Sequence, residues 1–241
     1  MRRAEDLMHS AQGRWTARYS GFLSDREQDL AAAALNRCGC DWYRFEGGYP
    51  DAERRLLCLE PEEESADVPV DCLLLECSGE APVHKDYLGA LMGLSIQRTG
   101  LGDIVLDPDR PGRAYVFALR SVSELICQEL TGVGRASVRV SLCDAEQAAA
   151  LAQLPRKRMH ATVSSLRADA VLSAMLNCSR GTASELIRTG RVEIRHIPVT
   201  SAHAPVYEGD VFTVRGKGRF KLEQLGGRSR KDRLFIEYTI Y

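Results

Sequence analysis

The apolar pattern is clearest near the C-terminus. Apolar residues recur there at the spacing of one helical face, at Ala168, Val171, Leu172, Met175 and Leu176. A second helix is predicted to begin after Ser179 as its N-cap and to end at Gly190. The alternation over 191–195 predicts a strand that buries Val192 and Ile194, and a further strand is predicted over 211–214. This pattern indicates a compact α+β unit over 165–241.

The middle of the chain alternates between strand and helix patterns. Strands are predicted over 71–77, 104–106, 114–118 and 138–142, and helices over 87–94 and 121–130. The order βαββαβ predicts a ferredoxin-like sheet, which many RNA-recognition (RRM-like) domains share. Tyr115 and Phe117 alternate on the third strand, so they could stack on RNA bases or belong to the core. We expect core positions.

The N-terminal part begins with helical patterns. Ser24-Asp25-x-Glu27 is a helix start, and the helix is expected to end near Gly39. Strands are predicted over 42–45 and 55–59, and the acidic stretch 61–65 is expected to be an exposed loop. The chain is therefore predicted to be α+β, with an N-terminal α/β subdomain (1–70), the ferredoxin-like domain (71–145), a partly helical linker (146–164) and the C-terminal unit (165–241).

Charge is unevenly divided along the 241 residues. The net charge is −1, but residues 1–154 carry 16 basic and 25 acidic residues (net −9), and residues 155–241 carry 16 basic and 8 acidic residues (net +8). A basic half indicates an anionic partner, and nucleic acid is favoured over a membrane because no basic amphipathic helix with bulky apolar residues is present. Neither a signal peptide nor an apolar run of bilayer length is recognisable, so we expect a cytoplasmic protein.

The candidate RNA site lies in the basic half. Four cations occur within seven residues at 215–221, spaced by glycines and beside Phe220, as phosphate contact and base stacking would require. Arg180, Ser184 and Arg188 recur every fourth residue and should form one exposed helical ridge. A solubilising loop tip is the alternative. The predicted RNA-binding residues are Arg167, Ser179, Arg180, Ser184, Arg188, Arg191, Arg215, Lys217, Arg219 and Lys221.

No catalytic or metal-binding pattern stands out. The eight cysteines are scattered and are expected to be reduced thiols; Cys38 and Cys40 form the only close pair, without a matching second pair. His84 and Asp86 could perform acid–base chemistry, but a helix start explains them better. We therefore predict no catalytic residues, metal, cofactor or small-molecule substrate.

Several motifs resemble known families. Leu166-Arg167-Ala168-Asp169, Ser179-Arg180-x-x-Ala183-x-x-Leu186-Ile187-x-x-Gly190 and Gly209-Asp210 resemble the RNA-binding domain named after ribosomal small-subunit protein S-four. The bacterial YlmH family is similar in the order of further motifs, at Phe22-Leu23-x-x-Arg26-Glu27-Gln28, Gly47-Gly48-Tyr49-x-x-x-Glu53-Arg54, His84-Lys85-Asp86-Tyr87-Leu88-Gly89-Ala90, Gly102-Asp103-Ile104 and the 215–220 loop.

The resemblance implies a function and one local difference. It implies an RNA-binding protein associated with the large ribosomal subunit carrying tRNA, in rescue of stalled translation, with a genomic link to cell division. A tight Val-Asn-Gly-like turn is frequent in S-four domains, whereas Arg195 and His196 stand there in this chain, so we expect a different turn.

The leading hypothesis is a non-catalytic protein that binds rRNA or tRNA. An RNA-modifying enzyme of pseudouridine synthase or methyltransferase type is one alternative, although their catalytic motifs are not recognisable. A cell-division scaffold is the other.

Overall fold

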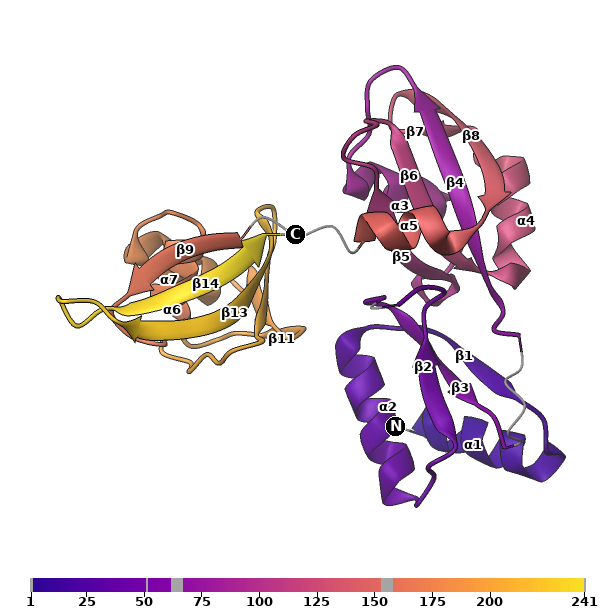
Figure 1. Cartoon of the computed structure of the whole chain (residues 1–241), viewed down its shortest axis with the longest axis horizontal. Helices are drawn as coiled ribbons and strands as arrows, with labels where there is room; N and C mark the ends of the chain where they lie inside the picture. The colour runs from indigo at the N-terminus through magenta and orange to yellow at the C-terminus, as the bar shows by residue number, and fades with distance from the viewer. Residues whose placement is uncertain (1, 51, 62–66, 153–157, 241) are drawn as a thin grey trace. The chain divides into compact units, whose positions relative to one another are not determined.

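The structure is a computed structural model that describes residues 2–50, 52–61, 67–152 and 158–240. Its contacts divide the chain into two compact units, Met1–Leu154 and Pro155–Tyr241 (Figure 1). This division coincides with the change from net negative to net positive charge. The expected acidic loop at 61–65 falls almost wholly outside the described residues.

The first unit begins with a three-stranded antiparallel sheet in the order β1-β3-β2, formed by β1 (Arg18–Leu23), β2 (Tyr43–Glu46) and β3 (Arg55–Leu59). Helices α1 (Arg2–Arg14) and α2 (Asp25–Arg37) pack on one face, where Met8, Leu35 and Leu57 share an apolar cluster. The predicted start of α2 is confirmed, since the Glu27 carboxylate accepts a hydrogen bond from the Ser24 amide at 2.8 Å.

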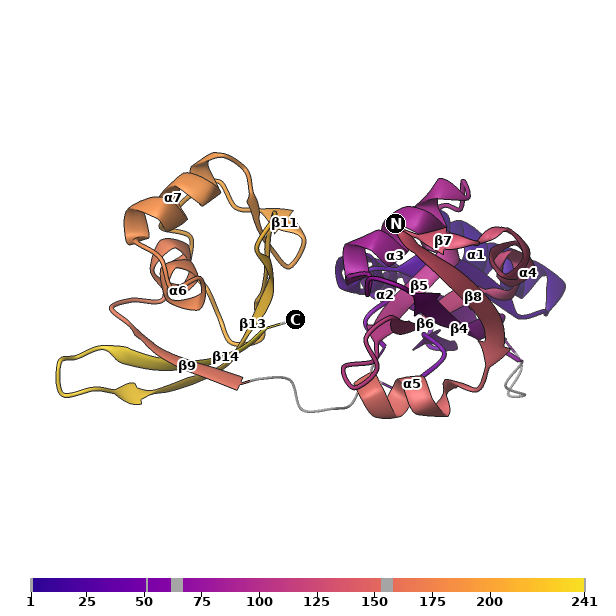
Figure 2. The same cartoon turned by 90° about the horizontal axis from the view of Figure 1, so that it is seen from above.

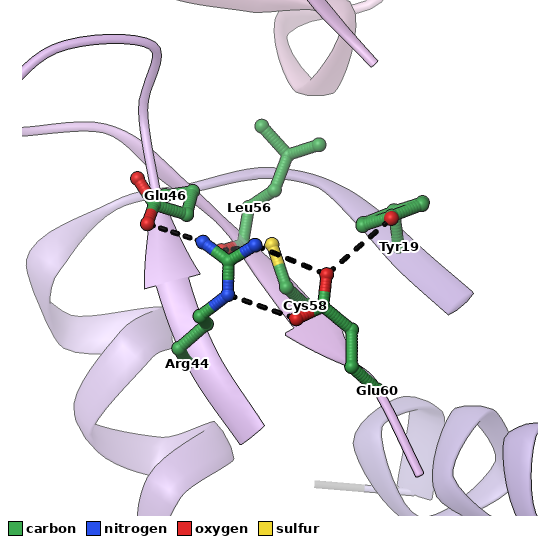
Figure 3. Close-up of polar contacts among 6 residues, drawn as sticks. All are labelled: Tyr19, Arg44, Glu46, Leu56, Cys58 and Glu60. Carbon is green, nitrogen blue, oxygen red and sulfur yellow. Dashed lines mark hydrogen bonds and ion pairs between the residues drawn. The ribbon is translucent and has the colours of Figure 1, made fainter. Parts of the chain in front are cut away.

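The other face of this small sheet carries a polar cluster around Arg44 (Figure 3). The guanidinium of Arg44 donates to both carboxylate oxygens of Glu60, at 2.9 and 3.0 Å, and also to Glu46. Tyr19 donates its hydroxyl to Glu60 at 3.4 Å. The hydrogen bonds that Arg44 donates to Glu60 hold the pKa of Arg44 above its usual value, and burial raises the pKa of the neighbouring Cys58 thiol to about 12. Cys58 is fully buried, which is the environment of a structural thiol.

The middle part follows the predicted order of strands and helices. Strands β4 (Val70–Ser78), β5 (Leu101–Leu106), β6 (Arg113–Leu119) and β8 (Ala136–Cys143), with the short β7 (Gly132–Val133), form an antiparallel sheet in the order β5-β6-β4-β8-β7. Helices α3 (His84–Gly93) and α4 (Arg120–Glu129) pack on one face, and a short 3₁₀ turn, η1 (Arg98–Gly100), precedes β5. The chain order β4-α3-β5-β6-α4-β8 is a split βαβ arrangement.

The opposite face of this sheet is covered. Helix α5 (Ala145–Ala152) lies across it, on the side away from α3 and α4 (Figure 2). Tyr115 and Phe117 are 1% and 0% exposed, and Tyr115 donates its hydroxyl to Gln147 of α5 at 2.8 Å. The ring of Tyr49 lies 4.6 Å from that of Phe117. The two aromatic residues are thus core positions, as we expected, and are closed to base stacking.

A single carboxylate joins the small sheet to the middle sheet. Asp103 of β5 accepts hydrogen bonds from the Tyr49 hydroxyl at 2.7 Å and from the amides of Glu53 and Arg54 at 2.7 and 3.1 Å. Burial raises the pKa of Asp103, while these hydrogen bonds act in the opposite direction. Three donors from the segment that enters β3 therefore converge on one residue of the other sheet.

Arg54 continues this junction with its side chain. Its guanidinium donates to the backbone carbonyls of Leu101, Phe22 and Arg98, at 3.1, 2.9 and 3.2 Å. Burial lowers the pKa of Arg54, and it lowers that of Arg98 to about 10. Gly102 allows the close approach, because a Cβ there would lie 2.7 Å from the Phe22 ring.

The second unit is one six-stranded antiparallel sheet with two helices on it. The order is β11-β10-β12-β13-β14-β9, formed by β9 (Arg158–Val163), β10 (Val192–Ile194), β11 (Ile197–Pro198), β12 (Val211–Val214), β13 (Gly218–Arg228) and β14 (Leu234–Ile240). Helices α6 (Ala168–Met175) and α7 (Arg180–Arg188) cover one face, and their apolar sides share a core with Phe212, Phe220 and Ile236 (Figure 2).

The expected linker 146–164 contains the expected helix, but its described parts are packed elements of the two units rather than a free connection. Most of α5 packs on the middle sheet, and β9 pairs with β14 along six residues, from Val163↔Leu234 to Arg158↔Thr239. Residues 158–163 thus form an edge strand of the sheet. Edge strands often carry cations on their exposed side, and this one begins with Arg158. The C-terminal sheet therefore starts before Ser165.

We expect Asp103→Ala to destabilise the first unit by about 2–4 kcal/mol, because it leaves three donors without their acceptor. Both tryptophans, Trp15 and Trp42, lie in this unit, so their fluorescence during urea unfolding reports its stability. The exposed Asp109→Ala is the matched control and should change the free energy of unfolding by less than about 0.5 kcal/mol. Equal effects of the two substitutions would contradict the role of Asp103.

Candidate nucleic-acid interface

The first predicted residues are organised by a buried carboxylate. Asp169 is 4% exposed and accepts hydrogen bonds from Arg167 at 3.2 and 3.0 Å and from Arg180 at 2.9 Å. Burial raises the pKa of Asp169, but the hydrogen bonds from both arginines outweigh burial and hold the pKa below its ordinary value. Arg167 occupies the N-cap position of α6 without capping through its side chain. Asp169 thus fixes two guanidinium groups at the start of α6 and α7.

The polar contacts of the predicted ridge on α7 differ between its N-terminal and C-terminal ends. Ser179 is the N-cap, and its Oγ accepts a hydrogen bond from the Thr182 amide at 3.0 Å. Arg180 is exposed and Ser184 is partly buried. Arg188 forms a forked ion pair with Glu185, at 2.9 and 2.6 Å. Arg188 therefore offers less net charge than the sequence pattern indicated.

The tight turn between β12 and β13 places three cations together. Arg191 donates its guanidinium to the Arg215 carbonyl at 2.9 Å, and the Arg215 amide donates to the Arg191 carbonyl at 2.9 Å. Lys217 closes the turn through its amide, which donates to Val214 at 2.9 Å, and Gly216 has a φ of 78°. Arg191, Arg215 and Lys217 are exposed. We call these three residues the turn cluster.

Residues 218–221 are strand rather than loop, which corrects one expectation. Phe220 pairs with Phe212 and is 4% exposed, so it is a core residue and cannot stack on a base. Arg219 and Lys221 alternate with it and face away from the helices, and Lys221 forms an ion pair with Glu223 at 3.0 Å. These two cations therefore lie on the sheet face that α6 and α7 do not cover.

The turn after β10 is tight, with residues other than the Val-Asn-Gly-like sequence frequent in S-four domains. Arg195 and His196 both have positive φ, 50° and 60°, between the paired residues Ile194 and Ile197, which is the geometry of a tight two-residue hairpin turn. Arg195 is 3.6 Å from Asp210, whose other oxygen accepts the Tyr207 amide at 2.8 Å. A carboxylate contact thus accompanies this turn where glycine or asparagine is usual.

A second cationic segment, which we did not predict, is the end of β13 with its connection to β14. It holds Arg228, Arg230, Lys231 and Arg233, all exposed. The signal was present in the sequence, since Gly226-Gly227 followed by four cations in six residues matches the density found at 215–221.

The proposed helix start at His84 and Asp86 is present, as Asp86 accepts the Val83 amide at 3.0 Å. Among the described residues, no three His, Cys, Asp or Glu side chains are placed to hold a metal ion. None of the helices in the described ranges is long and apolar enough to cross a membrane.

Comparison with known proteins supports the YlmH resemblance. Residues 81–147 match the family model described as "Putative RNA-binding domain in YlmH". The chain is 29% identical over 235 residues to Ribosome-associated protein quality control protein P2 of Bacillus subtilis (strain 168). The alignment covers 94% of this chain and 88% of that protein.

A solved structure shares part of the fold. Cell division protein ylmH from Streptococcus pneumoniae matches with a TM-score of 0.54 and 15% identity, over 61% of this chain and 90% of that one. The family match covers the middle of the chain, where we predicted no RNA-binding residues.

The lowered pKa of Asp169 predicts a pH dependence. A carboxylate whose pKa is lower in the folded state stabilises that state above its ordinary pKa of 3.8, and the contribution is lost as the pH falls through the folded value. An NMR titration of the Asp169 carboxyl carbon should give a midpoint below 3.8, and Arg180→Gln should raise it. A midpoint at or above 3.8 in the parent chain would show that the arginine pair does not hold this carboxylate.

Proposed function

We propose that this chain is a non-catalytic, cytoplasmic RNA-binding protein that binds rRNA or tRNA on the large ribosomal subunit in rescue of stalled translation. The observation that carries the proposal is the compact second unit with net charge +8, whose turn cluster and Asp169-held arginines present fixed cations. Such cations contact phosphates without reading base sequence. Similarity to a protein named for ribosome-associated quality control supports the ribosomal setting.

We further propose that the two units contribute differently to RNA binding. The second unit is of S-four type and supplies most of the electrostatic affinity. The middle domain, a ferredoxin-like domain, supplies a second contact, supported by the family match over 81–147. Its seven basic and eight acidic residues in that range predict a contact that depends less on salt than that of the second unit.

A role in cell division is the alternative that a specific observation favours, namely the name of the structurally similar pneumococcal protein. Co-sedimentation of the purified protein with large ribosomal subunits, followed by mapping of protected rRNA nucleotides, distinguishes the two. An RNA-modifying enzyme would leave altered nucleotides in rRNA incubated with the pure protein.

Replacing the turn cluster should weaken RNA binding uniformly across RNA sequences. We expect the triple variant Arg191→Ala, Arg215→Ala, Lys217→Ala to reduce the slope of log K against log salt by about 2–3, at 0.7–0.9 per lost phosphate contact. Filter binding of a short RNA duplex at several salt concentrations measures the slope.

The matched control for this variant is Arg188→Ala. Because Glu185 already pairs with Arg188, we expect a much smaller change in slope, and circular dichroism should show both variants folded. An unchanged slope in the triple variant would place the RNA surface elsewhere.

The second unit should fold by itself when β9 is included. Its core draws only on residues from 159 onward, so the fragment 155–241 should unfold cooperatively and keep most of the RNA affinity. The fragment 165–241 lacks β9 and the buried Val163, and we expect its Tm to be lower by roughly 10 °C. If the fragment 155–241 folds but binds no RNA, while the fragment 1–154 binds RNA well, the proposed contributions of the two units are wrong.

A further inference from the structure

The end of β13 and its connection to β14 form an arm, residues 226–233. Strand β12 pairs with β13 only as far as Lys221, and β9 pairs with β14 only as far as Leu234. The arm therefore extends past the neighbouring strands on both sides. Figures 1 and 2 show it as a narrow ribbon that projects from the sheet of the second unit.

The tip of the arm is held in one conformation by its own polar contacts. Ser229 and Arg233 exchange hydrogen bonds, from the Ser229 amide to the Arg233 carbonyl at 2.7 Å and from the Arg233 amide to the Ser229 Oγ at 3.1 Å. Asp232 lies between them with a φ of 55° and forms an ion pair with Arg228 at 2.7 Å. The cations at the tip are therefore presented by an ordered loop.

The base of the arm is anchored to the sheet. The Arg233 guanidinium donates to the hydroxyl and to the carbonyl of Thr162 in β9, at 3.0 and 2.5 Å. This leaves Arg230 and Lys231 at the apex, both exposed and, within the described part of the chain, without an ion pair. The arm holds four cations against one carboxylate, and it contains no large apolar side chain.

We propose that the arm is a second phosphate-binding element, which contacts the backbone of an RNA duplex through Arg230 and Lys231. The inference rests on the RNA-binding function proposed above and extends it. A membrane surface is disfavoured because the apex offers no apolar side chain to insert. The flanking Gly226 and Gly227 allow close approach to a backbone.

The position of the arm adds orientation to RNA binding. The turn cluster precedes the first residue of β13, Gly218, and the arm begins near its far end, at Gly226, so the strand separates the two by at most about 26 Å at 3.3 Å per residue. One phosphate contact leaves a duplex free to rotate about it, whereas two separated contacts fix its direction. The arm and the turn cluster should protect different segments of the RNA.

The test compares variants of the full chain on a short RNA duplex. Arg230→Ala with Lys231→Ala should reduce the salt slope by about 1.4–1.8 and lower the affinity about tenfold at low salt. Asp232→Asn should act in the opposite direction and raise the affinity, because it removes the only carboxylate of the arm. Asparagine tolerates the positive φ of this position. The control Arg2→Ala with Arg3→Ala makes the same charge change on α1 and should leave both values unchanged.

Hydroxyl-radical footprinting gives an independent readout. The arm variant should lose protection at one RNA segment and keep the segment that the turn-cluster variant loses. If the parent chain binds RNA and the arm variants keep its slope and footprint, the arm proposal is wrong while the proposed function stands. If the parent chain binds no RNA, both are wrong. Polyglutamate and anionic vesicles serve as anionic probes that are not RNA. If the arm variants lose binding to either of these probes but keep their binding to RNA, the RNA assignment is wrong.

Discussion

The first unit depends on the carboxylate of Asp103. It accepts hydrogen bonds from Tyr49, Glu53 and Arg54, and so joins the N-terminal sheet to the middle sheet across a junction where Phe22 lies against Gly102. Polar groups enclosed in this way are stabilising only when all of them are satisfied. The junction therefore fixes one relative position of the two sheets, and it places Tyr49 against Phe117 on the covered face of the middle sheet.

This junction explains motifs that sequence comparison alone leaves without a role. Gly47-Gly48-Tyr49-x-x-x-Glu53-Arg54 and Gly102-Asp103 meet around one carboxylate, and a Cβ at Gly47 would lie 2.3 Å from the Ala52 side chain. In the second unit, Arg167-Ala168-Asp169 and Ser179-Arg180 meet around Asp169 in the same manner. In both units, charged motif residues that look like parts of a functional site have a structural role, because they hold neighbouring elements together.

The sequence predicted elements well where one local signal determines them. Helix α2 has its capping residues at the N-terminus, and the middle sheet has apolar runs bounded by turns. Strands β9 and β13 were missed because cations and glycines on a sheet face or edge look like a loop. Strand β14 contains neither, and its apolar residues were not read as a strand. The ridge on α7 followed from helical spacing, but the partner of Arg180 lies eleven residues away and the spacing of the helix contains no information about it. Long-range carboxylate partners, which decide how much charge a cation offers, require the folded structure.

The covered sheet face limits how the middle domain can meet RNA. In RRM-like domains the exposed sheet aromatics stack on bases, whereas here α5 and Tyr49 bury Tyr115 and Phe117. Opening that face would require the loss of the Tyr115–Gln147 hydrogen bond and of the apolar contacts of Ala148. A contact between this domain and RNA would therefore use its helices or the edge of its sheet, where shape and backbone are recognised, and base-specific readout would have to come from another part of the chain.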